Sequence, residues 1–180
     1  MMTIGHSTLP IETFISILRE NGVRMLADIR TIPKSRHNPQ FAQDNLEPAL
    51  KAAGIRYRWY RDLGGLRHAR KDSINMAWRN TSFRGYADYM QTPEFAAALD
   101  HLLETVPQEH TALMCAEAVP WRCHRSLVAD ALTVRGIPVE EITYTAAGKS
   151  RRQPHKLIPF AHVKDGRVWY PAEDDLFAER

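Results

Sequence analysis

The sequence lacks the features that mark a secreted, membrane-spanning or disulfide-rich protein. Its 180 residues include two cysteines, and its first residues carry no basic region followed by an apolar stretch. No apolar run reaches the roughly 18 residues that a membrane-spanning helix requires. We therefore expect a cytoplasmic protein without a membrane partner, in which Cys115 and Cys123 are thiols, metal ligands or a reactive pair rather than a structural disulfide.

Several motifs of nucleotide and metal chemistry are missing as well. The sequence contains no Walker loop, no Gly-x-Gly-x-x-Gly and no His-Glu-x-x-His. The protein-phosphatase pattern, a cysteine with an arginine six residues later, is also absent, because Trp121 and Ala129 stand at those positions. This absence argues against a phosphocysteine mechanism.

What the sequence does contain is an alternation of strand-like and helix-like segments. Strand-like segments occur at 2–5, 23–29, 55–60, 111–115 and 139–144, and helical apolar spacing separates most of them. The segment 55–60 alternates between apolar and charged residues, which suggests one partly exposed face. This order predicts an α/β fold, a three-layer and mainly parallel open sheet with helices on both faces. We expect a single domain over 1–180, with an insertion at 61–92, where Gly64-Gly65 and scattered charges interrupt the pattern.

The polar residues follow the predicted strands. In an open parallel sheet the loops after the strands leave from one edge, and ligands bind in the crevice there. Four separate segments therefore deliver reactive side chains to one side. The candidate catalytic residues are His6, Asp28, Glu117 and Cys123, and the candidate anion-binding residues are Arg30, Arg36, His124, Arg125 and Ser126.

The segment 123–126 lies where the loop after the fourth strand becomes a helix. Free backbone N–H groups and the positive end of the helix dipole favour an anion there, and they lower the pKa of Cys123. Structural roles fit the same residues. Cys115 suits a small core position, Arg125 suits an ion pair with Glu117 or Asp28, and His6 suits a hydrogen-bonded structural histidine.

The charge is uneven along the chain. Arginine outnumbers lysine 18 to 6 although the net charge is only +3, and between residues 56 and 84 eight cations face two aspartates among several aromatic side chains. Stacking aromatics beside arginines suit single-stranded nucleic acid, and solvated arginines around a partly buried aromatic patch give the same pattern. The candidate nucleic-acid-binding residues are Arg56, Arg58, Trp59, Arg67 and Arg70.

The motif-bearing residues together resemble a known family. They are Thr3-Ile-Gly-His-Ser7, Asp28-Ile-Arg30 with Pro33, Ser35 and Arg36, Leu63-Gly64-Gly65, Phe83-x-x-Tyr86, and Cys115-x-Glu117-x-x-Pro120-x-x-Cys123-His124-Arg125. This ordered set, spread over nearly the whole chain, resembles the bacterial and archaeal domain of unknown function 488 family. The resemblance implies an intracellular α/β domain with a motif-rich loop edge, and it implies no reaction.

Three functions remain open at this point. The leading hypothesis is an enzyme, a hydrolase or a transferase, acting on a phosphate-bearing substrate such as a nucleotide, a sugar phosphate or a nucleic acid. The second is a metal site built from Cys115, Cys123 and His124, with His6 as a further candidate ligand, although the eight-residue spacing of the cysteines does not match structural zinc motifs. The third is a nucleic-acid-binding module without catalysis. The sequence identifies no cofactor, no bound metal and no oligomeric state.

Overall fold

A computed structural model describes residues 1–172 and contains a six-stranded sheet in the order β3-β2-β4-β1-β5-β6. The strands are β1 (Met2–Gly5), β2 (Met25–Asp28), β3 (Arg56–Trp59), β4 (Thr111–Cys115), β5 (Glu140–Tyr144) and β6 (Ser150–Pro154). The helices are α1 (Ile11–Glu20), α2 (Gln43–Ala52), α3 (Thr81–Tyr89), α4 (Pro93–Thr105) and α5 (Arg125–Val134). A separate hairpin joins β7 (His162–Lys164) to β8 (Arg167–Trp169).

The sheet is mainly parallel, as predicted. The first five strands pair in parallel, and β6 adds to β5 in the antiparallel direction. From β1 the chain steps outward to β2 and β3, and it then reverses through β4 to β5 on the other side of β1. β1 and β4 are neighbouring strands, and the loops that follow them turn toward opposite faces of the sheet. This divergence opens a crevice at the carboxyl edge of the sheet.

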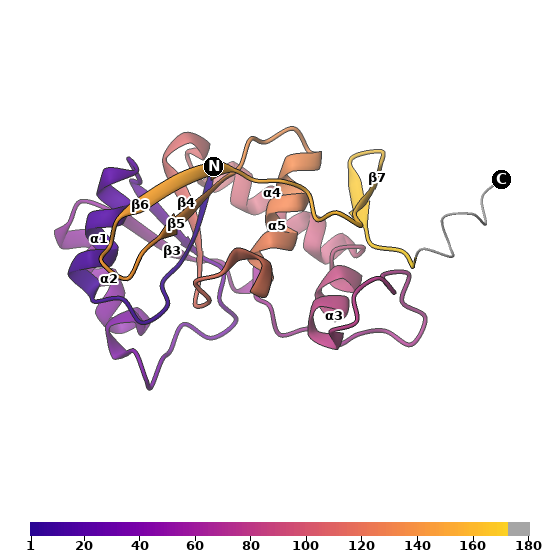
Figure 1. The fold of residues 1–180 in the computed structure, drawn as a ribbon, viewed down its shortest axis with the longest axis horizontal. Coiled ribbons are helices and arrows are strands. Elements are labelled where there is room, and N and C mark those ends of the chain that lie inside the picture. Colours follow the sequence, from indigo (N-terminus) through magenta and orange to yellow (C-terminus); the bar gives the residue numbers. More distant parts are fainter. Residues whose placement is uncertain (173–180) are drawn as a thin grey trace.

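Helices cover both faces of the sheet, with α1 and α2 on one side and α4 and α5 on the other (Figure 1). Alternating residues of β4 divide between the two cores, as a strand requires. Ala112 and Met114 pack with α1 and α2, whereas Leu113 and Cys115 pack with α4 and α5. The predicted three-layer α/β architecture is confirmed, and Cys115 is placed on the α5 face.

The segment predicted as an insertion folds against the α4 and α5 side. It begins with a 3-10 turn at Arg61–Leu63 and ends in α3. Its loop is organised around the buried Asp88, whose carboxylate accepts hydrogen bonds from the side chain of Asn75 at 2.8 Å and from the backbone N–H of Arg70 at 2.8 Å. Because these bonds fix the loop, it forms a wall beside the carboxyl edge of the sheet.

The chain after β5 is anchored to α5 by a buried polar network. His155 contacts Asp130 at 2.7 Å and Glu141 at 2.8 Å, and the hydroxyl of Tyr170 donates to Asp130 at 2.8 Å. Burial lowers the pKa of His155, but its hydrogen bonds to the two carboxylates outweigh this effect and raise the pKa to about 9. No helix within residues 1–172 is both long enough and apolar enough to cross a membrane.

Candidate functional site

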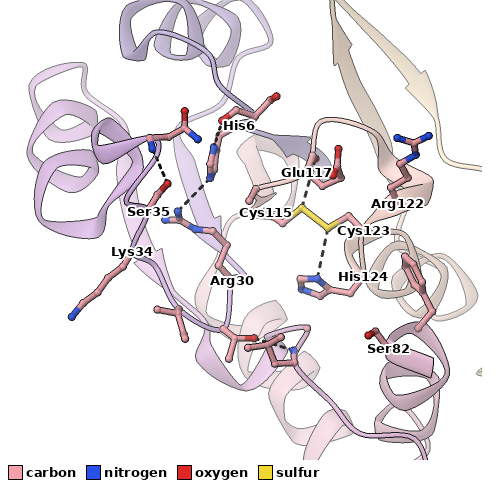
Figure 2. A pocket seen from close by; sticks show the side chains of 18 of the residues that line it. His6, Arg30, Lys34, Ser35, Ser82, Cys115, Glu117, Arg122, Cys123 and His124 are labelled. Carbon is pink, nitrogen blue, oxygen red and sulfur yellow. Dashed lines mark hydrogen bonds between the residues drawn. A yellow bond between two sulfur atoms is a disulfide. The ribbon is translucent and has the colours of Figure 1, made fainter. Parts of the chain in front are cut away.

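A cavity of about 750 Å³ lies at the crevice, between the loops that follow β1, β2 and β4. Ser7 and Thr8 come from the first loop, and Leu66 and Phe83 come from the wall after β3. The second loop contributes residues 31, 32, 34, 35 and 38, and the third contributes residues 116, 117 and 122–124. Figure 2 shows side chains from these separate loops around one space. The convergence predicted from the order of strands and loops is thus observed.

Asp28 lies beneath the cavity and does not line it. Its carboxylate is fully buried and accepts hydrogen bonds from Arg30 Nε at 2.9 Å and Nη2 at 2.6 Å, and from the Tyr57 hydroxyl at 2.7 Å. Both oxygens are therefore occupied. Burial and the neighbouring carboxylate raise the pKa of Tyr57, so the tyrosine stays a donor. The arrangement makes Asp28 an anchor for Arg30, which does line the cavity.

His6 lies at the cavity wall as a neutral imidazole. Its Nδ1 is 2.7 Å from the carbonyl oxygen of Ser7, so Nδ1 carries the proton and Nε2 is an acceptor, 3.4 Å from Nη1 of Arg30. The ring stacks on Phe41 with centroids 4.0 Å apart. Burial lowers the pKa of His6 to about 4, which keeps the imidazole uncharged at neutral pH.

The structure pairs the two cysteines as a disulfide, whereas thiols, metal ligands or a reactive pair were expected from the sequence. Cys115 ends β4, and the following loop returns through a 3-10 turn at Pro120–Arg122, which brings Cys123 back to the end of the strand. Cys123 also has extended backbone and precedes α5, rather than lying in its first turn. Both sulfurs line the cavity (Figure 2).

The imidazole of His124 lies against the sulfur of Cys123. Its Nε2 lies 3.0 Å from the carbonyl oxygen of Ile29, so Nε2 carries the proton and Nδ1 is an acceptor, 3.6 Å from Sγ of Cys123. Burial lowers the pKa of His124 to about 4. Gly65 allows this placement, because a Cβ there would stand 2.5 Å from Nδ1.

Arg125 and Ser126 lie inside the protein and do not line the cavity. The first N–H groups of α5 are already bonded, from Ser126 to the carbonyl of Cys123 at 3.1 Å and from Leu127 to that of His124 at 3.0 Å. Arg125 extends under the loop, where Nη1 is 2.9 Å from Sγ of Cys115 and Nη2 is 2.8 Å from the carbonyl oxygen of Ala118. The helix end is therefore turned to the loop rather than to the cavity.

One of the charges that line the cavity, that of Lys34, comes from a residue that sequence reasoning did not select. Arg30, Lys34 and Arg122 supply positive charge, and Glu117 is the lining carboxylate in the part of the chain that the structure describes. Lys34 and Arg122 lie on opposite rims (Figure 2). Arg36 is exposed and does not line the cavity. The sequence feature that could have identified the cations of the cavity rim is the presence of lysine and arginine in the loops after β2 and β4.

Three of the five candidate nucleic-acid-binding residues line one groove. Arg58, Trp59 and Arg67 line a second groove, on the outer side of β3 and α4, whereas Arg56 starts β3 and Arg70 pairs with Asp72 at 2.8 Å. Several of these side chains already have partners within the chain. The Trp59 indole N–H donates to the carbonyl of Arg30 at 2.8 Å, and the guanidinium of Arg67 lies 3.6 Å from the ring centre of Tyr89.

Residues 1–172 contain no group of three or more histidine, cysteine, aspartate or glutamate side chains placed to hold a metal ion. The proposed ligands Cys115 and Cys123 are bonded to each other, and His124 directs its protonated nitrogen to a backbone carbonyl. His6 has its Nδ1 at the Ser7 carbonyl and its Nε2 facing Arg30. The geometry gives no support to the metal-site alternative.

A family model described as Domain of unknown function DUF488 matches residues 10–132. The match includes β2 with its loop and the whole segment from Cys115 to Arg125, while the first strand and His6 lie before it. It bears out the resemblance indicated by the sequence motifs. No curated protein and no solved structure shows a significant match to this chain.

Proposed function

The chain belongs to the family described as Domain of unknown function DUF488, and this description names no reaction. From the site itself we propose that the protein is an enzyme acting on a phosphate-bearing substrate such as a nucleotide or a sugar phosphate. The observation that carries this proposal is the composition of the cavity at the carboxyl edge of the sheet. Three cations line it, and the only lining carboxylate among the described residues is Glu117. Arg30 is paired with Asp28 beneath the cavity, so Lys34 and Arg122 are the lining cations that this pair leaves uncompensated.

The cavity also suits an organic phosphate better than a bare anion. Its volume of about 750 Å³ falls in the range of small-molecule sites, which is roughly 300–1,000 Å³. Ile32, Leu66 and Phe83 add apolar wall, and the first two are exposed large side chains. A ligand with an apolar ring or sugar face at one end and a phosphate at the other would use both parts of the lining.

Each lining group then has a role that its surroundings permit. Arg122, on an exposed rim, binds the phosphate, while Arg30 is held in one orientation by Asp28. Glu117 is the carboxylate available as a general base for a hydrolase or transferase step. His6 stays neutral, and its acceptor nitrogen faces Arg30, so its role in the proposal is to help orient Arg30 rather than to take a proton.

Titration calorimetry with adenosine monophosphate tests this proposal. We expect the nucleotide to bind and uncharged adenosine to bind more weakly, since the two ligands differ only in the phosphate. Arg122→Ala should weaken binding of the nucleotide about threefold to tenfold, the range for an exposed charge-assisted contact. Ribose 5-phosphate against ribose provides the same comparison for a sugar phosphate.

Arg24→Ala is the matched control. Arg24 is also exposed, but it lies just before β2, at the opposite edge of the sheet, so its removal should leave binding unchanged. Equal effects of the two substitutions would show only a general attraction to a basic protein. Equal affinity for adenosine and its monophosphate, or no binding of either phosphate, would contradict the proposal.

A further inference from the structure

The two cysteines form a second functional feature of the cavity, one that the binding of a phosphate does not require. We infer that Cys115 and Cys123 are a reversible dithiol–disulfide pair in which Cys115 is the thiolate, paired with the buried guanidinium of Arg125, and in which small hydroperoxides are the oxidants. Both sulfurs line the cavity at the point where the loops after β1, β2 and β4 meet (Figure 2). A small oxidant in the cavity therefore has access to them.

The first argument is the charge of Arg125. Its side chain is fully buried, and no carboxylate within residues 1–172 forms an ion pair with it. Its partners are the carbonyl oxygens of Glu117 and Ala118 and the sulfur of Cys115, while Nε has no hydrogen-bond partner in the described part of the chain. Burial lowers the pKa of Arg125 to about 10, so the group remains charged at neutral pH.

Glu117 and Glu141 act on Arg125 from a distance, but neither forms an ion pair with it within residues 1–172. A buried cation without a contacting anion is unfavourable, and a thiolate at Cys115 supplies that contact. Nη1 of Arg125 is already 2.9 Å from Sγ of Cys115. In the disulfide this sulfur carries no charge, whereas in the reduced pair it becomes the missing anion. The contact therefore stabilises the reduced state and lowers the pKa of the Cys115 thiol.

The surroundings of Cys123 favour the opposite protonation. Its sulfur faces the acceptor nitrogen Nδ1 of a neutral His124 at 3.6 Å. This nitrogen accepts the S–H of a thiol and offers no positive charge to a thiolate. Cys123 is thus the thiol of the pair. It is also the more exposed of the two, with 7% of its surface accessible against 2% for Cys115.

Oxidation proceeds in two balanced steps. The Cys115 thiolate attacks the distal oxygen of the hydroperoxide, the O–O bond breaks, Cys115 becomes a sulfenic acid, and the alkoxide or hydroxide leaves and takes a proton from solvent. The Cys123 thiol then attacks the Cys115 sulfur, the disulfide forms, and the sulfenic oxygen leaves as water with the Cys123 proton. Two thiols are oxidised and one hydroperoxide is reduced.

Reduction requires an external low-molecular-weight thiol, and glutathione represents this class of compound. Its thiolate attacks Cys123, the more exposed sulfur, and Cys115 leaves as the thiolate that Arg125 stabilises. A second glutathione then attacks the mixed disulfide at its glutathione sulfur, which releases the Cys123 thiol and forms oxidised glutathione. The cysteine with the lower pKa is the better leaving group. Because Cys115 has the lower pKa in this proposal, the external thiol attacks Cys123 and Cys115 leaves.

The pair is tested by alkylating the reduced full-length protein with iodoacetamide over a series of pH values and measuring each cysteine peptide by mass spectrometry. We expect labelling of Cys115 to reach its half-maximal rate at least about two pH units below the ordinary thiol value near 8.5, and Cys123 to follow the ordinary value. Arg125→Met should return Cys115 to ordinary behaviour. The control Arg135→Met, at the other end of α5, should not.

A second measurement remains decisive if Arg125→Met does not fold. The oxidised wild-type protein is equilibrated with reduced glutathione, Cys115→Ser is equilibrated with oxidised glutathione, and both are examined by intact mass. The wild-type disulfide should open and re-form with added hydrogen peroxide, and Cys115→Ser should exchange with oxidised glutathione, hold one glutathione on Cys123 and release one reduced glutathione. Three results would each overturn the inference. They are a lowered pKa at Cys123 instead of Cys115, an ordinary thiol pKa at both cysteines, and a disulfide that glutathione opens only after the protein is denatured.

Discussion

Asp28→Ala is expected to lower the free energy of unfolding by about 3–5 kcal/mol, the range for removing one partner of a buried ion pair. Asp28 is fully buried. Without it the nearly buried guanidinium of Arg30 keeps, among residues 1–172, only the carbonyl of Phe41 and the ring nitrogen of His6 as partners. The Tyr57 hydroxyl loses its acceptor as well. Urea unfolding followed by circular dichroism measures this change.

Asp72→Ala is the control for Asp28→Ala. It removes the same carboxylate from another pair with an arginine, but Asp72 and Arg70 are both largely exposed and screened by solvent, so the free energy of unfolding should change little. An Asp28→Ala protein with the stability of Asp72→Ala would show that Asp28 is not an anchor. It would favour instead the catalytic role predicted from the sequence.

His155→Gln is expected to remove a pH-dependent part of the stability. The pKa of His155 in the folded protein, about 9, lies above its ordinary value near 6.5. The protonated form is therefore favoured by folding, and its contribution is complete below about pH 6.5 and lost as the pH rises through about 9. In the wild-type protein the free energy of unfolding should fall by about 2–3 kcal/mol across this interval, by the linkage of the two pKa values.

The His155→Gln protein should be less stable than wild type at pH 6 and should show a flatter profile up to pH 10. The reason is that Asp130, fully buried, and Glu141 lose the imidazolium between them. His68→Gln serves as the control, because His68 is exposed and lies outside this network. Unchanged pH dependence in His155→Gln would mean that His155 is neutral in the folded protein.

The fold was predictable as far as apolar patterning determined it. Buried strands such as 111–115 and amphipathic helices such as the one with Leu99 and Leu102 carry strong periodic signals, and both are observed. The strand β6 was not predicted, because its sequence Ser-Arg-Arg-Gln-Pro has no apolar alternation. It forms at the edge of the sheet by pairing its backbone with β5, and an edge strand of this kind needs little burial.

The site was predictable in position but not in the roles of its residues. The order of strands places the loops of His6, Arg30 and Glu117 together whatever their side chains do. Whether Arg125 faces a ligand or a cysteine depends on how the loop after β4 folds back, and the 3-10 turn at Pro120–Arg122 determines this. Sequence spacing contains no comparable information about the direction of a single side chain.

The central claim is that the cavity between the loops after β1, β2 and β4 binds the substrate phosphate. The most direct measurement is a titration of the isotopically labelled protein with adenosine monophosphate, followed by the backbone amide signals in NMR spectra. The signals that move should belong to residues 6–8, 30–38 and 115–124, and adenosine should move those of Arg122 and its neighbours less. Shifts gathered instead at the groove of Arg58 and Trp59, or no shifts at all, would contradict the claim.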